Sequence, residues 1–410
     1  MTTDATYVIA GASLAGAKAA EALREEGFDG QVILIGEESE RPYERPPLSK
    51  DYMLGKADRE TIYVHQEGWY AEHDVDLRLG VTVTGVDPSS HLVSLGDGTS
   101  HRYTKLLLAT GSSPRRLPVP GADQDGVLYL RSVRDSDRIK EAFGTAARVA
   151  VIGGGWIGLE TAAAARAAGV EVTVLEAAEL PLLRVLGRQV AQVFADLHRN
   201  HGVDLRGGVG VQEITSQNGT ATGVRLADGS IVQADAVIVG VGITPNTGLA
   251  AAAGLDTDNG IKVGSQLRSS NPDIYAAGDV ANAFHPLLGQ HVRVEHWANA
   301  LNQPAVAAKA MLGQVAAYDL VPYFFTDQYD LGMEYAGYVG PDSYREVVFR
   351  GHPDQGEFIA FWLGHEGQVL AGMNVNVWDV NDAIQALVRS GRAVDTGALS
   401  DEATPLESLA

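Results

Sequence analysis

The chain has 410 residues, 45% of them hydrophobic, which is enough for about two to three packed domains. Its 52 acidic and 31 basic side chains give a formal net charge of −21, which argues against nucleic acid as a partner and favours a well-solvated surface. There is no cysteine, so a redox-active disulfide, a cysteine sulfenate and a thiolate-ligated iron–sulfur cluster are excluded within this chain.

Targeting and metal signals are weak throughout the sequence. No apolar run reaches the ~18 residues of a membrane span. The first residues (MTTDATYVIAG) show neither a basic leader nor a separate apolar segment, so we expect a cytoplasmic protein. His198 and His201 are three residues apart near an expected helix end, but no third ligand accompanies them. A solvated helix end is therefore favoured over a metal site, and no metal is predicted.

The first expected unit is a strand at 7–10, a helix at 14–26 and a strand at 32–35. The loop before the helix reads Gly-Ala-Ser-Leu-Ala-Gly and follows the spacing of a dinucleotide-binding fingerprint, with serine in place of the second glycine. That serine is tolerated if its backbone stays at negative φ. The alternative is an ordinary turn between a strand and a helix. The candidate cofactor-binding positions of this loop are Gly11, Ser13, Ala15 and Gly16.

A second fingerprint, Gly-Gly-Gly-Trp-Ile-Gly, follows a strand at 148–152 and precedes a helix at 159–169. Its glycines suit a tight turn, close approach to a pyrophosphate and packing of helix on strand. The next strand ends in an acid that can bond a ribose diol. The candidate residues are Gly153, Gly155, Ile157, Gly158 and Glu176. Two such loops in one chain predict two bound dinucleotides and electron transfer between them.

Further strands are expected at 105–110, 236–241 and 274–279, and an Ala-rich helix at 299–312. After about residue 322 the pattern changes. Alternating, aromatic-rich segments at 344–350, 357–363 and 369–376 predict an antiparallel sheet, and a helix is expected at 380–389. The stretch from Arg392 is polar and rich in small residues, so we expect it to be mobile.

Six segments together carry a family resemblance: 41–50 (RPYERPPLSK), 109–111 (ATG), 242–246 (GITPN), 276–280 (AAGDV), 295–297 (EHW) and 322–329 (PYFFTDQY). With the two fingerprints, they resemble the FAD-dependent pyridine nucleotide–disulfide oxidoreductase superfamily. Within it, the chain is most similar to the ferredoxin reductases that serve cytochrome P450 and Rieske oxygenase systems. The missing cysteines agree with this branch rather than with the disulfide reductases.

The resemblance implies an α/β fold with two Rossmann-like dinucleotide-binding domains and a C-terminal α+β domain. Residues 1–113 and 240–322 would form a discontinuous FAD-binding domain. Residues 114–239 would form the NAD-binding domain, and 323–410 the C-terminal reductase or interface domain.

The resemblance also implies residue roles. Lys50 would face the flavin, Glu160 would approach the nicotinamide and pair with Lys50, and Trp297 would lie against the isoalloxazine. Glu37 would bond the adenosine ribose, and Asp279 the ribityl or pyrophosphate region. The other implied cofactor-binding positions are Arg45, Ala109, Thr110, Gly111 and Gly242. The residues alone also allow a helix-start lysine, a solvated helical acid and a core aromatic, and they give His296 no role.

The expected function is an NADH-dependent, FAD-containing ferredoxin reductase. It would pass electrons from NADH through FAD to a small iron–sulfur ferredoxin, of the [2Fe-2S] type, for a cytochrome P450 or Rieske oxygenase. Alternatives are a different acceptor, such as rubredoxin, a quinone or the ascorbate radical, or an NADH-sensing flavoprotein like apoptosis-inducing factor. An acidic ferredoxin needs a local basic patch on this acidic chain. Candidate docking residues are Arg45, Arg293, Arg389 and Arg392; Arg184, Arg188 and Arg199 are expected to be solvated helix residues.

Overall fold

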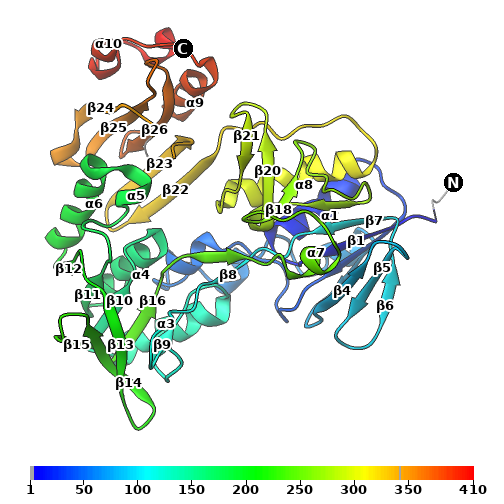
Figure 1. Ribbon diagram of the computed structural model, residues 1–410, viewed down its shortest axis with the longest axis horizontal. Coiled ribbons are helices and arrows are strands. Elements are labelled where there is room, and N and C mark those ends of the chain that lie inside the picture. The colour runs from blue at the N-terminus through cyan, green and yellow to red at the C-terminus, as the bar shows by residue number, and fades with distance from the viewer. Residues whose placement is uncertain (1–3, 341–342) are drawn as a thin grey trace. The chain divides into compact units, whose positions relative to one another are not determined.

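The computed structural model describes residues 4–340 and 343–410, which form two compact units (Figure 1). The first unit consists of residues 4–44, 59–113 and 244–320. The second consists of residues 45–58, 114–243, 321–340 and 343–410.

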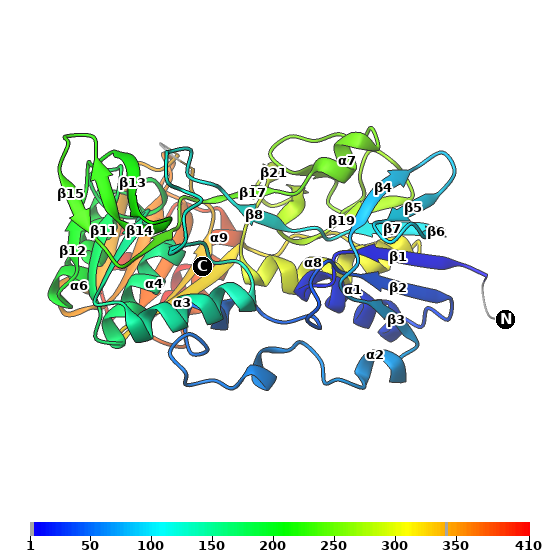
Figure 2. The same cartoon turned by 90° about the horizontal axis from the view of Figure 1, so that it is seen from below.

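The first unit is built on a parallel five-stranded sheet in the order β19-β7-β1-β2-β3, with most of its labels visible side by side in Figure 2. Its strands are β1 (Thr6–Ala10), β2 (Gln31–Ile35), β3 (Val75–Arg78), β7 (Lys105–Leu108) and β19 (Ile274–Ala276). Helices α1 (Leu14–Glu25) and α8 (Trp297–Met311) pack against each other. The central strands are continuous apolar runs because a parallel sheet is buried on both faces.

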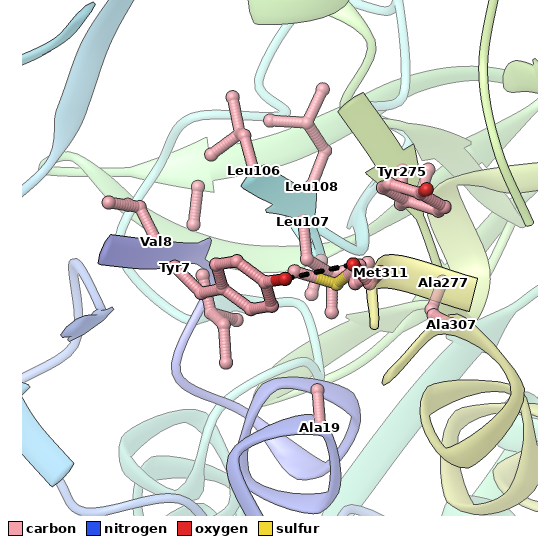
Figure 3. Packing of buried hydrophobic residues seen from close by; sticks show 14 of the residues in the cluster. Tyr7, Val8, Ala19, Leu106, Leu107, Leu108, Tyr275, Ala277, Ala307 and Met311 are labelled. Atoms are coloured by element: carbon pink, nitrogen blue, oxygen red, sulfur yellow. Dashed lines mark hydrogen bonds between the residues drawn. The ribbon is translucent and has the colours of Figure 1, made fainter. Parts of the chain in front are cut away.

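The core of this unit lies between the sheet and these helices (Figure 3). Val8 and Leu106–Leu108 are fully buried, and the methyl groups of Ala19 and Ala307 let the helices approach closely. The hydroxyl of Tyr7 donates to the carbonyl of Met311 at 2.9 Å, so its one polar atom is satisfied inside the core.

Shorter elements complete the first unit. One antiparallel sheet holds β4 (Val83–Asp87), β5 (Leu92–Leu95) and β6 (Ser100–Arg102). A second small sheet holds β18 (Ile261–Val263), β20 (Ala281–His285) and β21 (Gln290–Val292). The short helical segments are η2 (Arg59–Ile62), α2 (Trp69–Glu72), α7 (Gly248–Ala252) and η3 (Gly278–Val280). The chain crosses between the units at β8 (Ser112–Pro114) and β17 (Ile243–Pro245), which pair as a two-stranded sheet.

The second unit holds another parallel sheet, in the order β12-β11-β10-β16-β9. Its strands are β9 (Val127–Leu128), β10 (Arg148–Ile152), β11 (Glu171–Leu175), β12 (Asp204–Arg206) and β16 (Ala236–Val239). The helical segments are η1 (Pro46–Ser49), α3 (Val133–Thr145), α4 (Trp156–Ala167), α5 (Leu183–Leu186) and α6 (Arg188–Asn200). An antiparallel sheet is inserted between β12 and β16, with strands β13 (Val211–Gln217), β14 (Thr220–Leu226) and β15 (Ile231–Gln233).

The C-terminal part of the second unit is an antiparallel sheet in the order β22-β23-β26-β25-β24, drawn in orange tones in Figure 1. Its strands are β22 (Tyr323–Gln328), β23 (Leu331–Gly337), β24 (Glu346–His352), β25 (Glu357–Leu363) and β26 (Val369–Val375). The helical segments after β24 are η4 (Pro353–Gln355), α9 (Asn381–Ser390), α10 (Thr396–Ser400) and η5 (Leu406–Leu409). The fully buried Trp362 shares a core with Phe194 of α6 and donates its indole N–H to the carbonyl of Leu186 at 3.1 Å.

Two parallel sheets and a C-terminal sheet with helices confirm the predicted α/β class with its α+β addition. The predicted boundaries near 113, 240 and 322 fall within a few residues of the unit boundaries, but segment 45–58 belongs to the second unit. The division of the chain into three domains, with 114–239 separate from 323–410, stays a prediction.

The expectation of a mobile stretch after Arg392 is wrong. Leu399 and Leu406 are buried, and the Asp395 side chain caps α10 by accepting from the Ala398 N–H at 2.9 Å. Two well-spaced leucines among small polar residues were enough to anchor this segment, because each removes apolar surface from water.

Candidate dinucleotide cradles and a buried carboxylate

The loop between β1 and α1 requires glycine at two places. Gly11 has φ +122°, and a Cβ there would lie 2.1 Å from the Ala109 carbonyl oxygen. A Cβ on Gly16 would lie 1.9 Å from the Gly11 carbonyl oxygen. The loop therefore passes directly against the end of β7 and packs helix on strand, as a dinucleotide cradle needs.

Ser13 is compatible with this cradle. It is the N-cap of α1 in an extended conformation, with φ −115°, so the negative φ that the sequence required is confirmed. In the described chain its side chain makes no capping hydrogen bond, and α1 has no acidic residue in its first turn. The first N–H groups and the positive end of the 12-residue helix are thus available to an anion.

Residues predicted from distant motifs lie beside this first cradle. The loop after β7 is locked by Asn246, whose amide donates to the Thr110 carbonyl at 2.8 Å and whose backbone N–H donates to the Gly111 carbonyl at 2.9 Å. The methyl group of Ala15 lies 3.1 Å from where a Cβ of Gly278 would stand, with φ +78° at that glycine. The segment that carries Asp279 is therefore held against α1.

Asp279 and Glu37 differ in their surroundings. The carboxylate of Asp279 accepts a hydrogen bond from Ser112 at 2.8 Å, a partner that no sequence pattern suggested. Glu37 is exposed and follows Gly36, where a Cβ would lie 2.5 Å from the Ala12 methyl group. The close approach of Gly36 to Ala12 brings the end of β2 to the loop, which is where a ribose-binding acid is needed.

Trp297 is the first residue of α8 and is only partly buried, so it is not a core aromatic. Its indole N–H donates to the carboxylate of Glu44 at 3.2 Å. Burial raises the pKa of Glu44, and the hydrogen bond from Trp297 opposes that shift. His296 is the N-cap of the same helix, and desolvation lowers its pKa to about 4 against the opposing effect of Asp279. No role for His296 followed from the sequence, and this lowered pKa makes its ring a neutral imidazole at pH 7.

The second loop repeats the construction of the first. Gly153 has φ +105°, and a Cβ there would lie 2.3 Å from the Gly240 carbonyl oxygen. A Cβ on Gly158 would lie 2.0 Å from the Gly153 carbonyl oxygen. Gly155 is the N-cap of α4 with φ −79° and open space at its Cβ position, which is the place that Ser13 takes in the first loop.

Glu176 turns back onto this second loop. Its carboxylate accepts from the Gly154 N–H at 2.6 Å and from the Ala178 N–H at 2.7 Å. The side chain of Ile157 in the first turn of α4 is 45% exposed, and Gly242 is exposed with φ +100°. The loop, the first helical turn and the acid after β11 therefore gather at the carboxyl edge of one parallel sheet, as a dinucleotide site requires.

Glu160 lies on α4, two residues after Gly158, and is only 4% exposed. Its carboxylate accepts from the ammonium of Lys50 at 2.7 Å and from the hydroxyl of Thr326 at 2.6 Å, and also from the hydroxyl of Ser49. The alternative of a solvated helical acid is therefore wrong. The pair implied for Lys50 and Glu160 is present, with Lys50 itself only 12% exposed.

Ser49 and Thr326 were not among the predicted site residues. They stand inside two of the segments that carried the resemblance, 41–50 and 322–329, so position in those motifs was the available signal.

Next to Thr326, burial raises the pKa of Asp327, while Lys50 acts to lower it. Arg45 also belongs to the second unit, where its guanidinium donates to the Arg131 carbonyl. The cofactor roles of these residues stay predictions.

Of the two histidines near the end of α6, His198 is not solvated as expected, whereas the side chain of His201 is 36% exposed. His198 is fully buried, and desolvation lowers its pKa to about 4. The ring of His201 stacks on Tyr329 with 3.7 Å between centroids. Among the residues that the structure describes, no group of three His, Cys, Asp or Glu side chains is arranged to hold a metal ion.

The candidate docking arginines differ in how exposed their side chains are. Arg293 is wrong as a docking residue, because its side chain is only 6% exposed and pairs with Glu295 at 2.5 Å. Arg389 is exposed, and so is Arg392, whose guanidinium donates to the Ala410 carbonyl. As expected, Arg188 and Arg199 are exposed helix residues; they pair with Glu179 and with Asp196, respectively.

Comparison with known proteins agrees with this geometry. The family described as pyridine nucleotide-disulphide oxidoreductase matches residues 5–304, and the domain described as reductase C-terminal matches 323–410. The chain belongs to the pyridine nucleotide-disulphide oxidoreductase family.

Relatives narrow the branch of this family. The chain is 40% identical over 405 residues to the ferredoxin–NAD(+) reductase component of an anthranilate 1,2-dioxygenase system from Burkholderia cepacia, covering 98% of each chain. It is 36% identical over 414 residues to putidaredoxin reductase from Pseudomonas putida, covering 100% of this chain and 97% of the relative. The crystal structure of the covalent putidaredoxin reductase–putidaredoxin complex matches with a TM-score of 0.95 at 36% identity, covering 99% of this chain and 98% of that one.

The two cradles fit the cofactors of this family, which are FAD and NAD(H). At Gly11, Gly16, Gly153 and Gly158 a Cβ would overlap backbone, and that close packing shapes each loop around the N-terminus of a helix. By resemblance, the first cradle would hold FAD and the second NADH.

Proposed function

We propose that this protein is an NADH-dependent ferredoxin reductase, which passes electrons through FAD to a small [2Fe-2S] ferredoxin that serves a cytochrome P450 or Rieske oxygenase. The observation that carries the proposal is the repeated cradle, one on each parallel sheet, in a chain whose C-terminal part matches the reductase domain. Relatives that are ferredoxin reductase components of dioxygenase systems support the ferredoxin as partner.

When bound, FAD accepts two electrons together from NADH and can release them singly, so the chain needs no nucleophile of its own. The residues of the chain bind, orient and supply charge. The N-termini of α1 and α4, which have no side-chain cap among the described residues, would offer backbone N–H groups to the pyrophosphate of each cofactor. In the second unit, Glu160 and Lys50 would hold a fixed pair of opposite charges near the nicotinamide, where preorganised charge lowers the barrier to charge transfer.

Turnover with added electron acceptors tests the proposal. The purified protein should be yellow, release FAD rather than FMN on denaturation, and reduce cytochrome c with NADH rapidly only when a [2Fe-2S] ferredoxin is added. Equal rates with rubredoxin or a quinone would favour another acceptor. A long-lived complex of reduced flavin and NAD, without turnover, would favour the NADH-sensing alternative. Folded protein that takes up no FAD would overturn the whole assignment.

Nucleotide preference is the first specific prediction. The carboxylate of Glu176 lies at the second loop where a 2′-phosphate would stand, and repulsion between like charges should favour NADH over NADPH by roughly a hundredfold in kcat/KM. Glu176→Gln keeps an acceptor oxygen for the loop and removes the charge, so it should narrow the preference by about tenfold. Steady-state kinetics with both nucleotides measure it, and equal efficiency in the wild type would contradict the prediction.

Ferredoxin docking gives a second prediction. Charge reversal at Arg45, Arg389 or Arg392 should lower ferredoxin-dependent turnover, because the protein partner contacts the patch. At Arg389 and Arg392 the rate with ferricyanide should stay intact. Arg45 is also an implied cofactor-binding position, so its effect is measured as the ratio of the two rates. Arg188→Glu is the matched control, since Arg188 is exposed on α6 beside Glu179 and is not a docking candidate. If the three reversals, taken singly, change nothing, docking is apolar or uses another surface.

The cytoplasmic location stays a prediction. In the part of the chain that the structure describes, no helix is both long and apolar enough to cross a membrane.

A further inference from the structure

A row of buried polar side chains leads away from Glu160 through β22 to α6, entirely within the second unit. The Thr326 hydroxyl, which contacts the Glu160 carboxylate, lies 3.2 Å from Nε2 of Gln328. Oε1 of Gln328 lies 2.8 Å from Nε2 of His198. Nδ1 of the same histidine lies 3.1 Å from the hydroxyl of Tyr329.

The three middle groups of the row are buried, and Tyr329 at its outer end is partly exposed. Thr326 and Gln328 are each 1% exposed and His198 is 0% exposed. A buried polar group costs free energy unless it is hydrogen-bonded, and a partly satisfied network is worse than apolar packing. Apolar side chains of similar volume would fill the same space without that risk. Packing alone therefore does not require this row, and the direction of its hydrogen bonds indicates its role.

The donor-to-acceptor direction of each hydrogen bond in the row follows from the Glu160 carboxylate. The ionised Glu160 in its pair with Lys50 only accepts, so the single hydroxyl proton of Thr326 is donated to it. The Thr326 oxygen must then accept from the NH₂ group of Gln328, which turns the Gln328 oxygen toward His198. That oxygen accepts only from an Nε2–H. The remaining nitrogen, Nδ1, is then free to accept from the hydroxyl of Tyr329.

Every donor in the row thus points toward Glu160. Burial lowers the pKa of His198 to about 4, so the ring is neutral at pH 7 and carries one N–H, as this polarity requires. An amide group stands between the imidazole and the hydroxyl, and amides do not titrate in this range. The row therefore orients groups and does not carry protons.

We propose that Thr326, Gln328 and His198 are positioning residues for Glu160, which hold its carboxylate in one orientation through a one-directional chain of hydrogen bonds. Without this row the Thr326 hydroxyl is free to rotate, and only Lys50 and Ser49 still hold the Glu160 carboxylate. The proposal rests on the proposed place of Glu160 beside the nicotinamide. It assigns to the C-terminal domain a part in orienting the nucleotide site.

The first test measures the direction of the hydrogen bonds in the row and does not depend on turnover. In protein labelled with ¹⁵N-histidine, the His198 ring should show the Nε2–H tautomer at pH 7, with NADH absent. The Gln328→Met variant removes the acceptor that selects this tautomer, so the His198 signal should shift or split. A wild-type ring with its proton on Nδ1, or a protonated ring, would overturn the proposal.

The second test separates positioning from stability. Thr326→Val and Gln328→Met should lower the limiting rate of flavin reduction in stopped-flow experiments on the order of tenfold to a hundredfold, the range for a misplaced reacting group. The Kd for NADH and the FAD content should stay within about twofold of wild type, because the cradles are intact. Thr326→Ser keeps the hydroxyl and should restore the rate.

Asn374→Leu is the matched control. Asn374 is a buried amide of β26, in the same sheet as β22. It donates to Glu334 and to the Val377 carbonyl, neither of which belongs to the row. It should lower the melting temperature as Gln328→Met does and leave flavin reduction at the wild-type rate. If both variants slow reduction equally, or neither does while Glu160→Ala does, the positioning role is wrong although the reductase function stands. If the flavin of Glu160→Ala is also reduced at the wild-type rate, Glu160 does not act on the nicotinamide and this proposal is wrong as well.

Discussion

Replacing Glu160 by alanine is expected to slow flavin reduction by NADH roughly tenfold to a hundredfold while leaving FAD content nearly unchanged. The change also leaves the buried ammonium of Lys50 without its carboxylate partner, which lies at 2.7 Å. Removing one member of a buried ion pair costs about 3–5 kcal/mol, so the second unit should unfold at a lower denaturant concentration. Stopped-flow bleaching of the flavin and denaturant unfolding measure the two effects.

Two variants separate charge from shape in that experiment. Glu160→Gln keeps the volume and one acceptor oxygen but removes the counter-charge of Lys50, so it should lose rate through the missing charge and lose less stability than Glu160→Ala. Glu141→Ala removes an exposed acid from α3 and should change neither quantity. Wild-type bleaching in Glu160→Ala would mean that the buried pair is structural and that another group stabilises charge at the nicotinamide.

The substitution Gly16→Ala is expected to deplete the protein of FAD. Its new methyl group would lie 1.9 Å from the Gly11 carbonyl oxygen, which is backbone and has no rotamer to escape into. Forcing extra atoms into such packing costs about 1–3 kcal/mol, and the displaced loop should bind FAD about tenfold to a hundredfold more weakly. The ratio of flavin to protein absorbance after dialysis measures this loss.

The control for this substitution is Gly248→Ala in the same unit. Outside the backbone of its own helix, no atom of the described residues lies within 4 Å of the Cβ position of Gly248, so the variant should stay fully yellow. If Gly16→Ala keeps a wild-type flavin ratio, α1 can move away from β1 without harm and the close packing is not what forms the cradle.

Local sequence determined both cradles and most of the elements around them. The strand at 148–152 was predicted to the residue, and α1 ends one residue from its predicted end, because apolar runs and helical periodicity are properties of neighbouring residues. The need for negative φ at Ser13 could also be stated in advance, since it depends only on the conformation of one residue. Short strands such as β18 and β21 were missed because three residues carry no measurable period.

The surroundings of Glu160 were decided by tertiary structure. The sequence allowed a solvated acid on an Ala-rich helix, and only the resemblance paired it with Lys50. The structure buries it and adds Ser49 from one segment and Thr326 from another, 166 positions away in the chain. A hydrogen bond depends on distance and direction between atoms, and no pattern along the chain measures either for residues so far apart.

The same reason explains the expectations that were wrong. A histidine near a helix end was expected to be solvated, but His198 is buried because β22 supplies Gln328 as a partner for its ring. An arginine near Trp297 was expected to be free for docking, but the side chain of Arg293 is only 6% exposed and pairs with Glu295. The sequence by itself determined most of the elements and which two loops form the cradles, because those depend on neighbouring residues. Burial depends on residues brought together from the whole chain, so only the tertiary structure decided it. Burial in turn sets the protonation state and the hydrogen-bond partners of each polar group.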